Sequence, residues 1–425
     1  MIIIFEPQCR GFQHEQFNAG FLYGYSLAYP EEKIVFWGEK EHIQCIKTIF
    51  SSANLSLDNT EFVELEIPNP DLLMAVFEYS KIIKGLLSYS YKNNCDKIVL
   101  LSIHTYNLIP LKYLLQFKYK NTIRVHVAMH GILESVKRKN SSFLLEFFEK
   151  GTRYLKKTMG IENRQGKHEP KNKYLYEKLF KMSMHLFNNK NITYFVFRED
   201  SLLKLNKYLP KIYKYFKSID LPYIYKNVRN INFDTGSSNL MTFATFEKGY
   251  SNELRKIVRV LIHDNTLSDN FEIRILGGNV SKNLDTFEQI KYIGDSGKLL
   301  REEIEESIID ARYVLLFYPE NSYELMPSGV FFDAIAYSKP VVFLKNHCLD
   351  YYYEKYKFGY RCNNVDEMID AMGEIISTEE SSERSFVSEI IRMQQDITIS
   401  NNYLKLRFAK ETTMKTKRTI PGRVA

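Results

Sequence analysis

The sequence predicts an α/β protein of two doubly wound, Rossmann-like domains that face each other across a cleft. Three observations support this prediction. First, the chain has 425 residues, more than a single hydrophobic core usually serves. Second, short apolar runs alternate with helix-like stretches, which is typical of a parallel sheet covered by helices on both faces. Third, the alternation stops in the middle of the chain and then restarts at a similar scale.

The first run of alternation covers roughly the first half of the chain. Strands are expected at residues 2–5, 33–37, 61–67, 97–103, 122–129 and 193–197 because their apolar residues are nearly continuous. Helices are expected at residues 14–29, 42–50, 71–92, 109–117, 141–157, 174–188 and 201–209. Residues 220–234 carry Pro222 and no clear period, so we expect them to connect the two domains.

The second run begins after this connection. Strands are expected at residues 240–244, 272–276, 290–293, 313–317 and 341–344. Helices are expected at residues 252–265, 299–311, 329–337, 366–377 and 381–406. We therefore place an amino-terminal domain at 1–235 and a carboxy-terminal domain at 236–380. The helix of the last segment, 381–425, is expected to cross back to the first domain.

The overall composition excludes several classes of protein. The chain is 44% hydrophobic and 26% charged, as in ordinary globular proteins. No apolar run approaches the roughly 18 residues that a membrane helix needs, and residues 1–5 lack the basic start of a secretory signal. The five cysteines form no CxxC pair, which argues against a disulfide framework or a zinc site. These features are those of a cytoplasmic protein.

A basic, aromatic insert lies at residues 137–190. It holds 14 Lys and Arg against five Glu, whereas the net charge of the whole chain is only +7. A basic amphipathic helix with Phe and Tyr on its apolar side can lie on an anionic membrane surface. A helix pair docked on the first domain explains the pattern equally well. Nucleic acid is not expected as a partner, because no recognised binding motif accompanies the charge.

The segment most informative about chemistry is residues 313–344. A buried strand is followed by a polar loop, and Ser328 and Gly329 then open a helix. Ser328 is a good N-cap, and Gly329 allows another group to approach the backbone. Backbone N–H groups at a helix start favour a diphosphate, and Asp333, one turn further on, can bond a ribose diol. A capped helix that binds no ligand is the alternative interpretation of the same residues.

Residues 333–341, DAIAYSKPV, resemble the E-A-x-A-x-G-x-P-V motif of GT-B glycosyltransferases, in particular the retaining group around glycosyltransferase family four. Asp replaces the motif's Glu, and Ser replaces its Gly. Leu325 stands where the family often has an earlier acidic residue, and Glu324 is one place out of register. Tyr323 followed by Ser328 and Gly329 resembles a variant found among bacterial polysaccharide transferases.

The order of the preceding segments is also similar to that family. Residues 242–249, TFATFEKG, resemble the first strand and loop of the donor domain, where the resemblance implies that Lys248 holds the diphosphate. Phe243 occupies the place of the usual Arg. Gly277 follows the strand that ends in Gly in the family. The donor-binding residues that the resemblance implies are Lys248, Gly277, Tyr323, Ser328, Gly329 and Asp333.

In the amino-terminal domain the resemblance falls on strands that end in histidine. His130 follows a predicted strand, where an imidazole can bond a hydroxyl or a phosphate and change charge near neutral pH, and we take it as the catalytic candidate. His104 is the rival candidate, and a surface-loop histidine without a role is the alternative for both. Gly11 and His14 follow the first strand and are acceptor-side candidates, whereas His126, within a strand, is expected to pack.

The resemblance implies an enzyme of polysaccharide biosynthesis that transfers a sugar from a nucleotide-sugar donor to a hydroxyl of a glycan or lipid-linked glycan. It also implies retention at the anomeric carbon, no metal, no cofactor, and a peripheral place on the inner face of the cell membrane. A catalytically inactive GT-B subunit that binds a partner or a membrane is the alternative, because the usual Arg and the earlier acidic residue are missing. A nucleotide-sugar 2-epimerase shares the fold, but its carboxylate pattern is missing.

Overall fold

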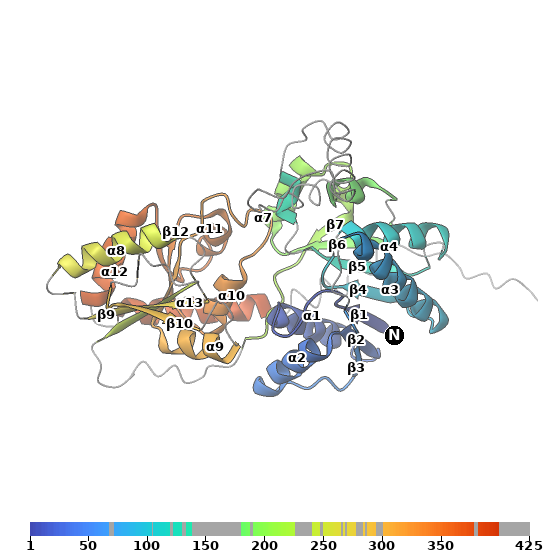
Figure 1. Ribbon diagram of the computed structural model, residues 1–425, viewed down its shortest axis with the longest axis horizontal. Helices are drawn as coiled ribbons and strands as arrows, with labels where there is room; N and C mark the ends of the chain where they lie inside the picture. The colour runs from blue at the N-terminus through green and yellow to red at the C-terminus, as the bar shows by residue number, and fades with distance from the viewer. Residues whose placement is uncertain are drawn as a thin grey trace, which may run out of the picture.

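The computed structural model describes residues 1–67, 72–103, 105–119, 122–129, 133–137, 180–187, 190–225, 240–246, 250–264, 267, 270–277, 284, 287–294, 301–377 and 381–398. Within these residues the chain forms two parallel sheets that lie side by side, each with helices on its faces (Figure 1). We call residues 1–225 the amino-terminal half and residues 240–398 the carboxy-terminal half.

The amino-terminal half is built on a parallel sheet. Its strands are β1 (Ile2–Phe5), β2 (Ile34–Gly38), β3 (Thr60–Glu64), β4 (Lys97–Leu100), β5 (Arg124–Ala128), β6 (Ile192–Val196) and β7 (Phe216–Ser218). Its helices are α1 (Glu15–Ala28), α2 (Lys40–Ser52), α3 (Leu72–Lys92), α4 (Thr105–Phe117) and α7 (Glu199–Tyr208), with 3-10 turns at Leu133–Lys137 and Tyr213–Tyr215. Every residue of β1 and β4 is buried, because helices cover both faces of these central strands.

The carboxy-terminal half repeats this plan. Its strands are β8 (Met241–Thr245), β9 (Phe271–Leu276), β10 (Ile290–Ile293), β11 (Tyr313–Leu316), β12 (Val341–Leu344) and β13 (Gly359–Cys362). Its helices are α8 (Ser251–His263), α9 (Arg301–Asp310), α10 (Gly329–Ala336), α11 (His347–Tyr353), α12 (Val365–Ser377) and α13 (Ser381–Thr398). Two doubly wound α/β sheets are what the sequence predicts, and the fold class is confirmed.

The strand orders place one switch point in each sheet. The first sheet has the order β3-β2-β1-β4-β5-β6-β7, and the second has the order β10-β9-β8-β11-β12-β13. The order reverses between β1 and β4 in the first sheet, and between β8 and β11 in the second. Parallel sheets of this kind bind ligands outside the carboxyl ends of the strands at such points. We therefore expect one ligand-binding edge in each half, at the carboxyl ends of its strands.

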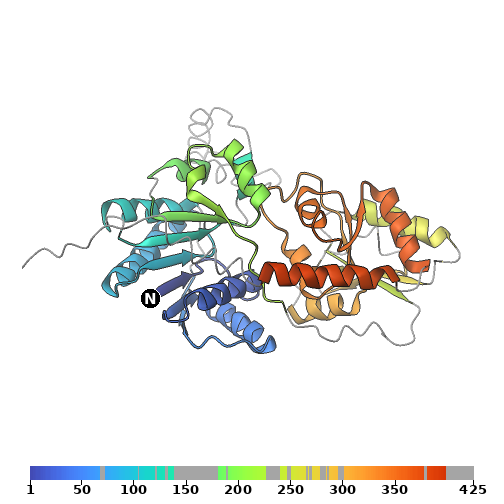
Figure 2. The ribbon, with the colours of Figure 1, turned by 180° about the vertical axis from the view of Figure 1, so that it is seen from behind.

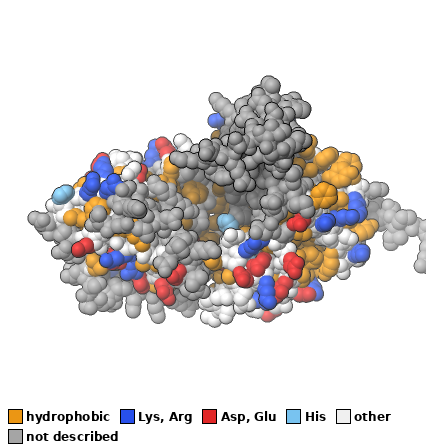
Figure 3. Space-filling view, viewed as in Figure 1, with side chains coloured by type: hydrophobic (Ala, Val, Ile, Leu, Met, Phe, Trp, Pro, Cys, Tyr) orange, Lys and Arg blue, Asp and Glu red, His pale blue; other side chains and the backbone are white. Residues whose placement is uncertain are grey.

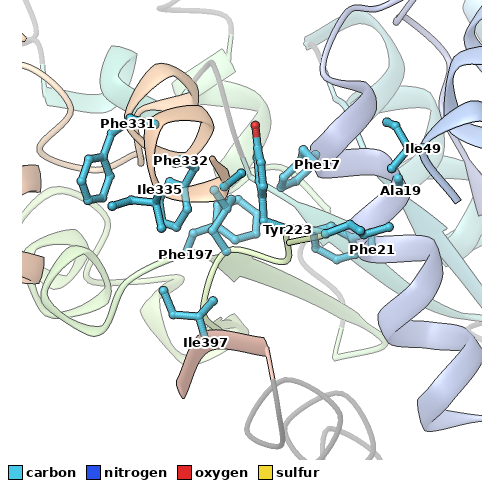
Figure 4. Close-up of a cluster of buried hydrophobic side chains, with 14 of the residues drawn as sticks. Phe17, Ala19, Phe21, Ile49, Phe197, Tyr223, Phe331, Phe332, Ile335 and Ile397 are labelled. Carbon is cyan, nitrogen blue, oxygen red and sulfur yellow. The ribbon is translucent and has the colours of Figure 1, made fainter. Parts of the chain in front are cut away.

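The two halves share one hydrophobic core. Phe17 and Phe21 of α1 belong to the same buried cluster as Phe331 of α10, and Tyr223 of the connecting segment lies between them (Figure 4). α13, red in Figure 2, runs from the carboxy-terminal half toward α1, and its Ile397 joins the same cluster. Buried apolar contact of this extent holds the halves together.

Besides the 3-10 turns, the structure adds three elements that the sequence pattern does not predict. They are β7, α11 and β13, which are short. Two other predictions fall largely outside the described residues, namely the insert at 137–190 and the chain beyond Thr398. None of the helices in the described ranges combines the length and apolar content that crossing a bilayer requires. All five cysteines are described, and none of them forms a disulfide.

Candidate functional site

An aromatic pocket lies at the switch point of the second sheet, beyond the carboxyl ends of β8 and β11. Its lining residues are Phe246, Tyr250, Leu315, Leu316, Phe317, Tyr318, Tyr323 and Val330. The rings of Tyr318 and Tyr323 lie 4.7 Å apart between centroids, and Tyr250 stacks on Phe317 at 5.8 Å. Its free volume is about 30 Å³, room for about one water molecule, and its walls combine apolar side chains with phenol groups. We call it the aromatic pocket.

The N-terminus of α10 opens beside this pocket. The N-cap predicted at Ser328 is confirmed, because its Oγ accepts a hydrogen bond from the Phe331 N–H at 3.2 Å. The same Oγ lies 2.7 Å from the Tyr318 hydroxyl, and Ser328 is fully buried. Gly329 is exposed, and a Cβ built there meets no atom within 4 Å. The first turn of α10 is therefore approachable at Gly329, while the Ser328 hydroxyl serves the structure of the turn.

Asp333 points from α10 toward the other half of the molecule. Its Oδ1 accepts a hydrogen bond from the hydroxyl of Tyr223, which belongs to the segment that connects the halves. The Asp333 carboxylate is half-buried. Its charge also acts on His14, which lies in the loop after β1. The structure thus brings a predicted donor-side residue and a predicted acceptor-side residue together across the interface.

A buried polar chain supports the loop after β1, at the switch point of the first sheet. The Asn18 Nδ2 atom donates to Glu6 Oε2 at 3.2 Å and lies 2.8 Å from His42 Nε2, while His42 Nδ1 lies 2.7 Å from the Gly11 carbonyl oxygen. Because that carbonyl can only accept, the proton of His42 lies on Nδ1. Burial lowers the pKa of His42, which keeps the ring neutral. The sequence pattern does not predict this buried polar chain.

The polar chain fixes the backbone that carries the two acceptor-side candidates. Glu6 Oε1 accepts hydrogen bonds from the backbone N–H groups of Gln8 and Cys9 at 2.8 and 3.1 Å. Gly11 has φ +49° and His14 has φ +55°, so the loop turns twice through left-handed conformations. The residue His14 is exposed to solvent. Desolvation lowers its pKa, and the charges of Glu6 and Asp333 oppose that effect.

Other predicted positions are found away from the pocket or outside the described residues. His126 packs inside the first sheet, as expected, with its Nδ1 2.5 Å from the Tyr25 hydroxyl. Gly277 follows β9 with φ +67°, a conformation that favours glycine. Phe243 is fully buried within β8. The candidates outside the described residues are Lys248, His104 and His130.

The two switch points carry different kinds of groups. The aromatic pocket provides stacking surfaces, the start of α10 provides an N–H group and a positive dipole end, and the β1 loop faces them. Within the described ranges, no group of three or more His, Cys, Asp or Glu side chains is arranged to hold a metal ion.

Solved structures of known proteins share this architecture. The chain has the GT-B fold, two Rossmann-like α/β domains with a ligand edge in each. WaaG, a glycosyltransferase involved in lipopolysaccharide biosynthesis, superposes with a TM-score of 0.55 at 8% identity, over 97% of this chain and 100% of that one. Sucrose-phosphate synthase from Thermosynechococcus elongatus has a TM-score of 0.56 at 11% identity, over 96% and 98%. HepE of Anabaena, in complex with UDP-glucose, has a TM-score of 0.56 at 10% identity, over 96% and 98%. No protein-family model matches the chain, and no curated protein matches it.

Proposed function

We propose that this protein is a glycosyltransferase that transfers a sugar from a nucleotide-sugar donor to a hydroxyl of a glycan or lipid-linked glycan, with retention at the anomeric carbon. The observation that carries the proposal is the pair of switch points on two parallel sheets, with an open helix start at Gly329 at the second of them. HepE, of the same fold, binds UDP-glucose. Lys248 and His130 remain the diphosphate-binding and catalytic candidates of this proposal.

The donor would lie on the carboxy-terminal half and the acceptor on the loop after β1. A helix N-terminus stabilises the negative charge that develops on a leaving diphosphate. Enclosure between the halves excludes water, which otherwise competes as the acceptor. Transfer is proposed to need no metal ion, so EDTA should leave its rate unchanged.

The first experiment is a thermal-shift panel with uridine, guanosine and cytidine diphosphate sugars. A ligand that binds only the folded protein raises its melting temperature, so a donor should shift the transition by several degrees at 100 times its Kd. Donor hydrolysis and transfer products, with the anomeric configuration assigned by NMR, then establish the reaction. A protein that binds none of these sugars would contradict the proposal.

A second experiment assigns Asp333. Asp333→Ala should weaken the binding of nucleotide and nucleotide-sugar equally, because the ribose is common to both. Tyr223→Phe, which removes the hydrogen bond to Asp333, serves as the matched variant and should have a smaller effect. Loss of turnover with unchanged nucleotide affinity would instead place Asp333 at the reacting carbon.

An inactive GT-B subunit is the second candidate function. The observation that favours it is Leu325, which is fully buried where the family often has an acidic residue. Such a subunit would bind a partner transferase or a membrane without catalysis. Absence of donor hydrolysis together with absence of any donor-dependent thermal shift would support this candidate over the enzyme.

We also propose that the protein lies peripherally on the inner face of the cell membrane. Tyr113 and Phe117 of α4 are 51% and 55% exposed, and their rings meet that of Phe187 at 5.8 and 5.7 Å. Figure 3 shows hydrophobic side chains gathered beside Lys and Arg at this end of the amino-terminal half. We call the rings of Tyr113, Phe117 and Phe187 the aromatic surface. Lys181 and Lys190 stand close by in the sequence, which suits an anionic leaflet.

A further inference from the structure

A loop of the carboxy-terminal half is docked into the amino-terminal half. The side chain of Leu325 is fully buried, and it belongs to the hydrophobic cluster that otherwise consists of residues of the amino-terminal half. Met326, next in the chain, packs against the same cluster. The position where the family often has an acidic residue is therefore occupied here by an apolar anchor.

Polar side chains of the amino-terminal half bind the backbone of the same loop. Arg198, which follows β6 and is 1% exposed, donates through Nη1 to the carbonyls of Tyr323 and Met326 at 3.0 and 3.1 Å, and through Nη2 to that of Glu324 at 2.7 Å. Its remaining N–H groups bond the carboxylate of Asp200 at 2.8 and 3.2 Å. All five donors of the guanidinium are used, which only this planar group can do.

Two further contacts complete the attachment. The Leu325 N–H donates to Glu134 Oε1 at 2.6 Å, and the Ser201 hydroxyl donates to the Glu324 carbonyl at 3.1 Å. Four consecutive residues of one half thus have their backbone bound by side chains of the other. Tyr323, the first of them, has φ +58°, a strained conformation for a tyrosine, and its ring lines the aromatic pocket.

We infer that Arg198 is a positioning residue that holds residues 323–326 against the amino-terminal half, so that the wall of the aromatic pocket at Tyr323 is in place only while the two halves are in contact. The inference rests on the proposed function for its ligand, a nucleoside diphosphate. Opening of the halves would break the three hydrogen bonds from Arg198 to these carbonyls, which disfavours the open state. Closure and nucleotide binding are therefore coupled through this loop.

The test replaces Arg198 and measures two properties of the folded protein. The first is the distance between spin labels at Lys92→Cys and Arg259→Cys, exposed positions in the two halves, in a Cys45→Ser background. The second is the affinity for UDP by calorimetry. Arg198→Met should lengthen and broaden the distance distribution and weaken UDP binding by roughly tenfold or more, because the competent closed state becomes a minor population. Arg198→Lys should not restore either value, because one ammonium cannot span four acceptors.

Arg361→Met is the matched control. Arg361 forms a comparable two-nitrogen contact with Asp350 inside the carboxy-terminal half, so its loss should lower stability and leave the distance and the UDP affinity unchanged. Leu325→Ala is the second test variant if Arg198→Met does not fold. Unchanged distance or unchanged UDP affinity in a folded variant overturns the inference. If the wild-type protein binds no UDP, that result counts against the proposed function, and the distance alone decides the role of Arg198.

Discussion

At Gly329 the missing side chain leaves the first turn of α10 open beside the aromatic pocket. Gly329→Val should fold with a melting temperature close to that of the wild type, because its Cβ meets no neighbour within 4 Å. The added methyl groups would occupy the space that a diphosphate needs against the backbone, so nucleotide binding should be lost. Calorimetric titration with UDP and thermal unfolding of both proteins measure the two effects. Normal UDP affinity in a folded Gly329→Val protein would show that the start of α10 is not part of the nucleotide-binding site.

Residues that act within one local segment were predictable, and residues that act across segments were not. The N-cap at Ser328 follows from residue type and position in the sequence, and the structure confirms it. Arg198 could have been noticed as a charge at the end of an apolar strand, but the three carbonyls that it binds lie more than 120 residues away. The contact of Asn18 with His42 likewise depends on how α1 and α2 pack.

At the scale of elements, α1 and the connecting segment pack closely at Gly20. A Cβ at Gly20 would lie 2.5 Å from the carbonyl atoms of Pro222. Gly20→Ala should therefore destabilise the protein by roughly 1–3 kcal/mol through overpacking, although alanine favours a helix by about 1 kcal/mol.

The matched control for this substitution is Gly85→Ala in α3, where a Cβ meets nothing within 4 Å. It should stabilise the protein by about 0.5–1 kcal/mol, because only the helix preference changes. Urea unfolding of both variants provides the comparison. An equal increase in the free energy of unfolding of both variants would show that the connecting segment moves away from the new methyl group without a loss of stability.

A buried lysine joins α4 to the helical segment at 180–185. Lys112 Nζ donates to the carbonyls of Ser183 and Met184 at 2.8 and 3.0 Å, and desolvation lowers its pKa from 10.5 to about 7. Between these two pKa values the unfolded chain binds a proton that the folded chain does not, so stability rises with pH across this window. Across this pH window, the titration of Lys112 raises the free energy of unfolding by roughly 3–5 kcal/mol in total.

Lys112→Met should remove this pH dependence from the free energy of unfolding between pH 7 and pH 10. Lys118→Met, at an exposed position just after α4, is the control and should keep the wild-type slope. Denaturant unfolding at several pH values measures the slopes. Parallel curves for wild type and Lys112→Met would mean that the ammonium is not desolvated in the folded protein.

The central strands and the edge strands β3 and β10 were predictable, whereas the edge strands β7 and β13 were not. The central strands are mostly apolar, so their positions follow from the sequence, and the structure places β1 at the same residues, Ile2–Phe5. The edge strands β7 and β13 are short and only partly apolar, because one side of each needs no partner. Each of them is held in place by its pairing with a neighbouring strand, β7 with β6 and β13 with β12.

At the scale of the whole molecule, the aromatic surface predicts membrane attachment. Tyr113→Ser combined with Phe117→Ser should reduce co-sedimentation with vesicles of anionic lipid, because two exposed rings no longer enter the interface. Binding should also weaken as salt rises, since screening shortens the reach of the nearby lysines. Phe77→Ser, at a 69% exposed position in α3, is the control. Equal sedimentation of the wild type, the double variant and the control would show that the aromatic surface does not bind lipid.

The shared core also fixes an order of events during synthesis. Phe197 enters the growing chain 134 residues before Phe331, with which it shares the buried cluster between the halves. At about 5–20 residues per second, the first sheet waits on the order of ten seconds for the side chains that cover it. During that interval Phe17, Phe21 and Phe197, which pack against one another, lack the residues of α10 and α13 beside them. The protein should therefore depend on a chaperone that shields this face until α10 and α13 have left the ribosome.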